Sequence, residues 1–159
     1  MLKFKSLILF LLLFPALIFA KTTPFIIDTD MAIDDVMAIL YLTQHPNVDV
    51  KAISISGTGE AHCVYALKNL SGLLQLVKKN IPYACGAQKP LRYDHHFTDE
   101  VRLSADTILG TAQLLPRKNK ATTSTVTLLE KTLQESTDKI TILAIGPLTN
   151  IAELLQKKA

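Results

Sequence analysis

The order of its predicted elements constrains this chain most, because short β-prone segments alternate with helical patterns along its length. Runs of apolar, often β-branched residues bounded by turn formers predict buried strands. They lie at 24–29, 48–56, 81–85 and 138–146. Apolar residues that recur every three or four positions predict helices. They lie at 33–45, 63–80, 99–110, 124–136 and 148–158. This alternation predicts an α/β fold, an open and mostly parallel, Rossmann-like sheet with helical crossovers.

The first twenty residues have the layout of a secretory signal peptide. Lys3 and Lys5 form a basic start, and an apolar stretch of 14 residues runs from Leu7 to Ala20. Such a stretch spans about 21 Å as a helix, which is short for a hydrocarbon core of about 30 Å. We therefore expect residues 1–20 to direct export to the periplasm or medium without a stable membrane anchor. We expect residues 21–159 to form one domain or part of one.

The charge balance argues against a nucleic-acid partner. The net charge is +3, but without Lys3 and Lys5 the chain has 15 basic and 14 acidic residues. Because basic and acidic residues are nearly equal in number, the composition gives no indication of a basic surface for a polyanion.

The two cysteines leave two interpretations open. In an exported protein, Cys63 and Cys85 could pair. Cys63 lies on the apolar face of a predicted helix and Cys85 ends a predicted strand, so we favour two buried small side chains.

Four carboxylates crowd the end of the first predicted strand. Asp28, Asp30, Asp34 and Asp35 fall within the eight residues DTDMAIDD. The segments GTGEAH and GPLTN follow two other strands. Ligands of open α/β sheets bind beyond the carboxyl ends of the strands, so we expect all three segments to converge on one site.

Crowded acids must either raise a pKa or gather around a cation. Aspartate and backbone oxygens without His or Cys suit a hard ion, Ca²⁺ or Mg²⁺. The simpler alternative is a solvated loop whose acids favour the start of a helix. An aspartate after a strand also suits a Mg²⁺-dependent phosphatase with an aspartyl nucleophile.

Three segments together carry a resemblance to a known family. They are IIDTDMAIDDVMAILYL, SISGTGEAHCVYALKNLSGLL and AIGPLTNIAELL, and they extend from about Phe25 to the end of the chain. In this order they resemble the inosine-uridine-preferring nucleoside hydrolase family. Chains of that family are about twice as long. The resemblance therefore implies that residues 21–159 are the N-terminal part of a truncated nucleoside-hydrolase-like domain.

The resemblance also implies roles for individual residues. Asp30 corresponds to a calcium ligand that acts as the general base, Asp35 to a second calcium ligand, and the carbonyl of Ile145 to a main-chain ligand. Asp34 corresponds to an aspartate that holds a ribose hydroxyl, and Asp28 to one that supports the loop or the surroundings of the metal.

Other positions depart from the family pattern or have weaker roles. Met31 and Ala32 replace the usual proline and glycine, and Glu60 stands where many members have asparagine. Glu60 either contacts the sugar or caps the helix that follows. His95 and His96 lie in a polar loop, which we interpret as solvated. Asn69 and Asn150 match recurring asparagines to which we assign a structural role.

The implied function is calcium-dependent hydrolysis of the N-glycosidic bond of ribonucleosides, with a small-molecule nucleoside as substrate. The family tends to form homo-oligomers, and a complementing C-terminal fragment is a second candidate partner. We expect the 159-residue chain to hydrolyse nucleosides poorly or not at all. The alternative is a non-catalytic nucleoside or ribose binder, or a remnant.

Overall fold

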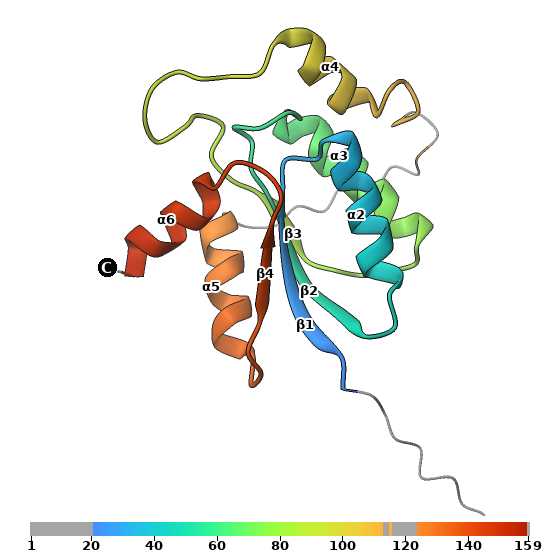
Figure 1. The fold of residues 1–159 in the computed structure, drawn as a ribbon, viewed down its shortest axis with the longest axis vertical. Coiled ribbons are helices and arrows are strands. Elements are labelled where there is room, and N and C mark those ends of the chain that lie inside the picture. Colours follow the sequence, from blue (N-terminus) through green and yellow to red (C-terminus); the bar gives the residue numbers. More distant parts are fainter. Residues whose placement is uncertain (1–20, 113–114, 116–123, 159) are drawn as a thin grey trace, which may run out of the picture.

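The computed structural model describes residues 21–112, 115 and 124–158, and the expected signal peptide lies outside them. Along the chain the elements alternate as predicted (Figure 1). They are β1 (Thr23–Thr29), α2 (Ile33–Gln44), β2 (Val48–Ile55), α3 (Cys63–Leu76), β3 (Tyr83–Cys85), α4 (Asp99–Thr107), α5 (Thr125–Glu135), β4 (Thr141–Ala144) and α6 (Thr149–Lys158). The third and fourth strands are shorter than predicted. In the fourth, pairing with β1 is confined to the four residues opposite Phe25–Asp28.

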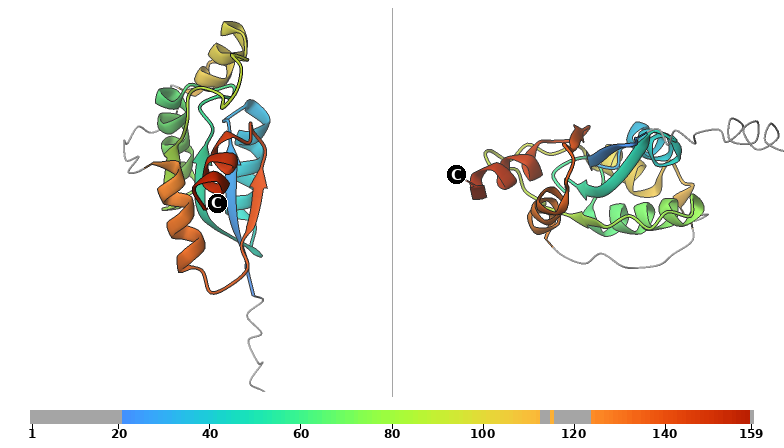
Figure 2. Two further views of the ribbon diagram at one scale, coloured as in Figure 1. Left: turned by 90° about the vertical axis from the view of Figure 1, so that its left-hand side faces the viewer. Right: turned by 90° about the horizontal axis from the view of Figure 1, so that it is seen from below.

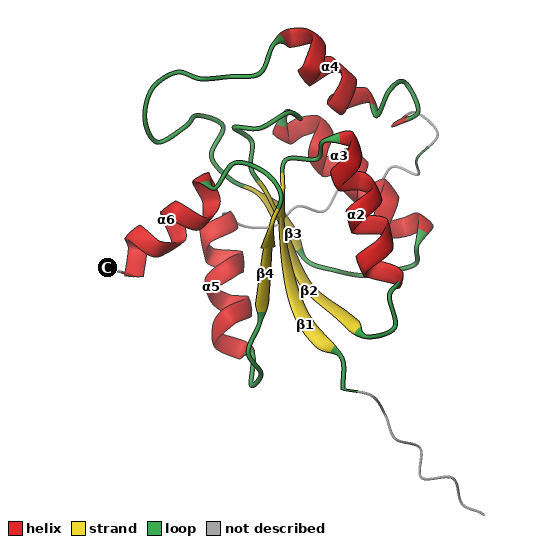
Figure 3. Ribbon diagram, viewed as in Figure 1, coloured by secondary structure: helices red, strands yellow, loops and turns green. Residues whose placement is uncertain are grey.

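The four strands form one parallel sheet in the order β3-β2-β1-β4, which confirms the predicted α/β class (Figure 3). Successive side chains of a strand point to opposite faces, and both faces are covered. Ile27 and Ile53 pack in one cluster with α2 and α3. Ile26 and Ala52 pack in a second cluster with α5 and α6.

The order of the strands in the sheet reverses at one point. The chain builds β1, β2 and β3 in one direction and then returns to place β4 on the other side of β1. In open α/β sheets the ligand site lies where the order reverses, outside the carboxyl ends of these strands. The amide of Ile145 donates to the carbonyl of Asp28 (2.8 Å), so the two segments leave the sheet together.

Helix α4 lies at the end of the molecule toward which the strands point (Figures 1 and 2). It follows the long segment from Gly86 to Thr98, which carries little regular structure. Among the described residues, none of the helices is both long and apolar enough to cross a membrane.

The cysteines correct one expectation. Cys63 and Cys85 form a disulfide with their Cα atoms 5.7 Å apart, rather than two buried thiols. Cys63 is the first residue of α3 and Cys85 the last of β3, so both lie at the carboxyl edge of the sheet. The helical pattern placed Cys63 on the correct face, but it carried no information on the neighbouring strand end.

The disulfide gives a first testable prediction. Replacing Cys63 and Cys85 with serine is expected to lower the free energy of unfolding by about 3 kcal/mol, because the bond closes a loop across a separation of 22 residues. Urea unfolding of both proteins measures the difference. Reductant should lower the midpoint of the wild type and leave that of the double variant unchanged. Equal sensitivity of the two proteins would contradict the prediction.

Candidate functional site

Asp30 lies at the centre of the carboxyl edge, between two glycine-bearing loops. It follows β1 directly and is 4% exposed. A Cβ atom on Gly59 would overlap the Asp30 side chain, with Cγ only 2.6 Å away. A Cβ on Gly146 would come within 2.7 Å of the Asp30 amide nitrogen. Only residues without side chains can let both loops approach so closely, which is why these two glycines flank the acid.

The Asp30 side chain has one occupied oxygen and one free oxygen. Its Oδ2 accepts from the amide of Glu60 (3.2 Å), and its carbonyl accepts from the amide of Ala61 (3.1 Å). Its Oδ1 is buried and has no hydrogen-bond partner within the described part of the chain. A buried carboxylate oxygen without a donor is costly, so this atom is a candidate position for a cation or a proton.

Asp35 lies beside Asp30 in the first turn of α2 and is 3% exposed. Its Oδ2 accepts from the hydroxyl of Thr29 (2.5 Å) and from the amide of Asp30 (3.1 Å). Burial raises the pKa of the Asp35 carboxyl to about 7, and the negative charge of Asp30 adds to the shift. In turn, the Thr29 hydroxyl accepts from the amide of Met31 (2.9 Å). Thr29 thus orients Asp35, a role that sequence reasoning missed.

The backbone shows how Met31 and Ala32 take the place of the usual proline and glycine. Met31 takes the left-handed conformation, with φ at 60°, while Ala32 keeps an ordinary φ of −57°. Met31 is also 1% exposed and packs in the core. Core packing and the bond to Thr29 hold a residue in a conformation that non-glycine residues rarely adopt.

Asp28 lies beneath the site, completely buried. Its Oδ1 accepts from the Ser54 hydroxyl (2.5 Å) and from the Asn150 side-chain amide (2.8 Å). Burial is the main reason that the pKa of the Asp28 carboxyl is raised, since the bonds from Ser54 and Asn150 lower it. Asp28 therefore joins β1 to β2 and α6, and Asn150 is structural in the sense that we predicted.

Asp34 and Glu60 form the outer rim of the site. Asp34 is exposed although it is adjacent to buried Asp35, because successive helix residues point about 100° apart. Glu60 is partly exposed. Its pKa is raised by burial and by the negative charges of Asp30 and Asp34. The Glu60 carboxyl therefore lies within the electrostatic influence of Asp30 and Asp34, while the backbone amide of Glu60 donates to Asp30.

The donor set fits a hard cation in kind. Asp30 and Asp35 offer carboxylate oxygens, and one of the Asp30 oxygens is partnerless. Across the described residues, no group of three or more His, Cys, Asp or Glu side chains is arranged to hold a metal ion. Calcium takes six to eight oxygens, so further oxygens must come from backbone carbonyls, water or substrate. Ile145 follows β4 and lies beside Asp28, so its carbonyl is a candidate for one of these further oxygens.

A cavity of about 300 Å³ adjoins this edge. It is lined by the loop residues His95, His96 and Phe97 and by Thr58 and Thr149, among others. Both histidines are exposed, as expected for a solvated loop.

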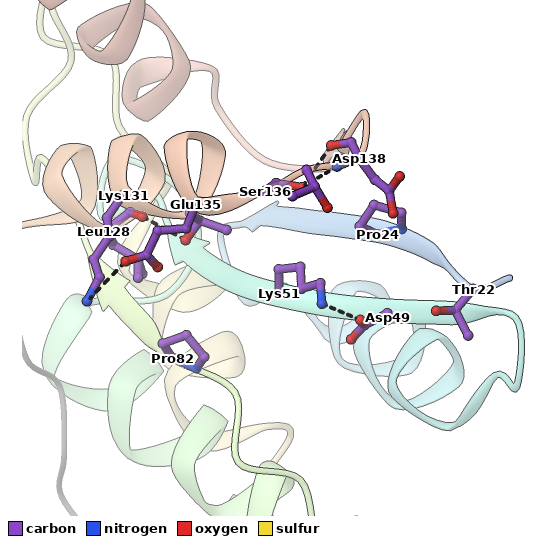
Figure 4. A pocket seen from close by; sticks show the side chains of 12 residues that line it. Thr22, Pro24, Asp49, Lys51, Pro82, Leu128, Lys131, Glu135, Ser136 and Asp138 are labelled. Carbon is purple, nitrogen blue, oxygen red and sulfur yellow. Dashed lines mark hydrogen bonds and ion pairs between the residues drawn. The ribbon is translucent and has the colours of Figure 1, made fainter.

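A larger cavity of about 420 Å³ lies at the opposite end of the sheet (Figure 4). Lys51 and Asp49 pair there at 2.5 Å, and Lys131 lies 3.9 Å from Glu135. Its charges are thus matched within the protein, and it lies at the start of β2 rather than at the carboxyl ends. We do not assign a ligand to it.

The pKa shifts give a second testable prediction. A carboxyl whose pKa is raised on folding stabilises the fold fully below its ordinary value of 3.8 and loses that contribution as the pH rises through the folded value. Without a cation, the wild type should therefore lose on the order of 5 °C in Tm between pH 5 and pH 8.

The matched control for this prediction is Asp35→Asn, because an amide does not titrate there. Thermal melts in chelator should show a shallower loss of Tm with pH for this variant than for the wild type. Identical slopes would contradict the assignment of the pH dependence to Asp35.

Comparison with known proteins identifies the class. The fold is that of solved nucleoside hydrolases. Residues 25–159 match the family model described as inosine-uridine preferring nucleoside hydrolase, and the chain belongs to that family.

Two relatives and two solved structures show the extent of the likeness. The chain is 39% identical over 133 residues to the pyrimidine-specific ribonucleoside hydrolase RihA of Citrobacter koseri, and 37% identical to that of Escherichia coli O7:K1. Each alignment covers 83% of this chain and 42% of the relative. The plant nucleoside hydrolase PpNRh1 superposes with a TM-score of 0.74 at 32% identity, over 85% of this chain and 43% of that one. An inosine-guanosine nucleoside hydrolase gives 0.69 at 26% identity, over 86% and 42%. The chain therefore spans less than half the length of these relatives.

Proposed function

We propose that this chain carries the cation-binding and ribose-binding part of a calcium-dependent ribonucleoside hydrolase site, which cleaves the N-glycosidic bond to give ribose and free base. One observation carries the proposal. Asp30 is buried at the switch point with a partnerless oxygen, next to the buried carboxyl of Asp35, which accepts from the Asp30 amide. Membership of the nucleoside hydrolase family supports the reaction.

Asp30 and Asp35 are the proposed calcium ligands, together with the carbonyl of Ile145. Bound Ca²⁺ would supply positive charge that holds the ribose diol and acidifies the attacking water. The amide of Glu60 fixes one oxygen of Asp30 and leaves the other free, so Asp30 can accept a proton as general base. Thr29 and the amide of Asp30 fix Asp35 in place.

The reaction is a direct displacement at the anomeric carbon. A bond forms from the water oxygen to that carbon as the bond to the base nitrogen breaks, and the electron pair leaves with the base. The proton of the water passes to Asp30. On the rim, Asp34 is exposed and Glu60 partly exposed, so both are available to sugar hydroxyls. We assign no residue of this chain to protonation of the leaving base. We therefore propose that turnover by the 159-residue chain is slow.

Nucleoside hydrolysis by the purified chain tests the proposal. Inosine and uridine are incubated with calcium or with chelator, and hypoxanthine and uracil are measured, while calorimetry measures binding of calcium and nucleoside. We expect both to bind, and slow product release only with calcium. Product release that chelator leaves unchanged would overturn the calcium dependence. Binding without product would identify the alternative, a non-catalytic nucleoside binder, and absence of nucleoside binding would overturn both.

We also propose export and an interaction partner. The Cys63–Cys85 disulfide supports an oxidising compartment. Expression with residues 1–20 should yield periplasmic protein whose mass corresponds to a chain that begins at Lys21, and cytoplasmic protein of full mass would contradict this.

Strand β4 is at the edge of the described sheet and its Ile142 is 37% exposed, which suits pairing with a second copy of the chain or with a complementing fragment. Light scattering tests self-association.

A further inference from the structure

Helix α4 is held to the rest of the molecule by polar contacts more than by apolar ones. Only Ala105 and Asp106 of its nine residues are buried. Ala105 joins the core, whereas Asp106 presents a carboxylate that is 7% exposed. A buried carboxylate must find donors, and these donors identify what α4 touches.

Both oxygens of Asp106 are taken by one residue, His62. The amide of His62 donates to Oδ1 (2.7 Å), and the ring Nδ1 donates to Oδ2 (2.8 Å). Nε of Arg102 also contacts the ring, 3.0 Å from Nε2 and 3.5 Å from Nδ1 of His62. An ionised carboxylate can only accept, so the proton of the bond to Asp106 lies on Nδ1.

Arg102 contacts both ends of the loop formed by residues 57–62, because it reaches Gly57 as well as His62. Arg102 lies one helical turn before Asp106 on α4, and its Nη2 donates to the carbonyl of Gly57 (3.4 Å). The side-chain amide of Asn69 donates to the carbonyl of Asp106 (2.9 Å) and ties the end of α4 to α3. Helix α4 thus contacts both ends of segment 57–62.

Segment 57–62 is also the segment that holds Asp30. The amides of Glu60 and Ala61 donate to Asp30, and the next amide, that of His62, donates to Asp106. Three consecutive amides are therefore fixed by two buried aspartates: Asp30 after β1, through its carboxylate and its backbone carbonyl, and Asp106 on α4, through its carboxylate.

From this geometry we propose that Asp106, with His62 and Arg102, is a positioning residue that fixes segment 57–62 and thereby the orientation of the Asp30 carboxylate. The consequence for calcium affinity rests on the proposed function. The effect on the segment itself does not. Partners that orient a metal ligand change metal affinity by roughly 10-fold to 100-fold when they are lost.

Asp106→Asn tests the proposal with two readouts. The amide keeps the shape of the side chain but cannot accept from both groups of His62, so the His62 ring must turn or change tautomer and lose Arg102. We expect hydrogen exchange at the Glu60 and Ala61 amides to accelerate at least about 10-fold, and calcium affinity at 25 °C to fall about 10-fold. Asp99→Asn, an exposed acid on the same helix, is the matched control and should change neither.

The outcomes separate this proposal from the proposed function. Faster exchange confined to His62 and α4, with unchanged calcium affinity, would mean that α4 merely rests on the loop and would overturn the proposal. A wild type that does not bind calcium would overturn the proposed function, and exchange at Glu60 and Ala61 would still decide whether Asp106 fixes the segment. Should Asp106→Asn not fold, Arg102→Gln is expected to show the same changes in weaker form, and its lack of effect at Glu60 and Ala61 would also overturn the proposal.

Discussion

Replacing Gly59 with alanine is expected to lower the free energy of unfolding by about 3 kcal/mol or more and to displace Asp30. The new Cβ would overlap the Asp30 side chain, whose Cβ and Cγ cannot rotate away because Asp30 is buried between two loops. The backbone conformation of Gly59 does not cause the expected loss of stability, because Gly59 is outside the left-handed region. Urea unfolding measures the loss.

Gly110→Ala is the control for this contact. Gly110 has a φ of 86° but nothing within 4 Å of the new Cβ, so its cost is limited to backbone strain of about 1 kcal/mol. Equal losses in the two variants would contradict the claim that close contact with Asp30 requires Gly59.

Replacing Asp30 with asparagine is expected to change stability and cation binding in opposite directions. Without a cation, removal of this charge relieves the repulsion that raises the pKa values of Asp35 and Glu60, so the apo protein should become more stable at pH 7.5. Calcium affinity should fall at least about 100-fold because a charged ligand is lost. Thermal melts and calorimetry measure the two effects.

The exposed Asp94 supplies a matched control in the loop before α4. Asp94→Asn removes the same charge and should leave the apo stability within about 0.5 kcal/mol and calcium affinity unchanged. A loss of apo stability in Asp30→Asn would contradict the view that the acids are crowded at a cost in stability. Such a cost is typical of sites retained for function.

The sheet could be predicted because its pattern is local. Apolar strands of four to eight residues, alternating with amphipathic helices, fix parallel pairing and carboxyl-end convergence on physical grounds alone. That convergence is why Asp30, Glu60 and the GPLTN segment were expected at one edge, and the structure places them there.

The contacts inside the site could not be predicted, because they depend on distances between segments. Thr29 and Ser54 look like ordinary strand residues, yet each donates to a buried aspartate. Asp106 lies on a helix whose docking no periodicity specifies, and its partner His62 is 44 residues away. The disulfide was the less favoured alternative for the same reason, since Cys63 and Cys85 meet only through tertiary packing.

Calcium-dependent stability of the purified chain tests the central claim most directly. The claim is that a divalent cation compensates the buried carboxylates of Asp30 and Asp35. At pH 7.5, Tm should rise steadily as calcium is titrated above its Kd, by the mass-action relation, and chelator should reverse the rise. An unchanged Tm at millimolar calcium, with no heat of binding, would contradict the account.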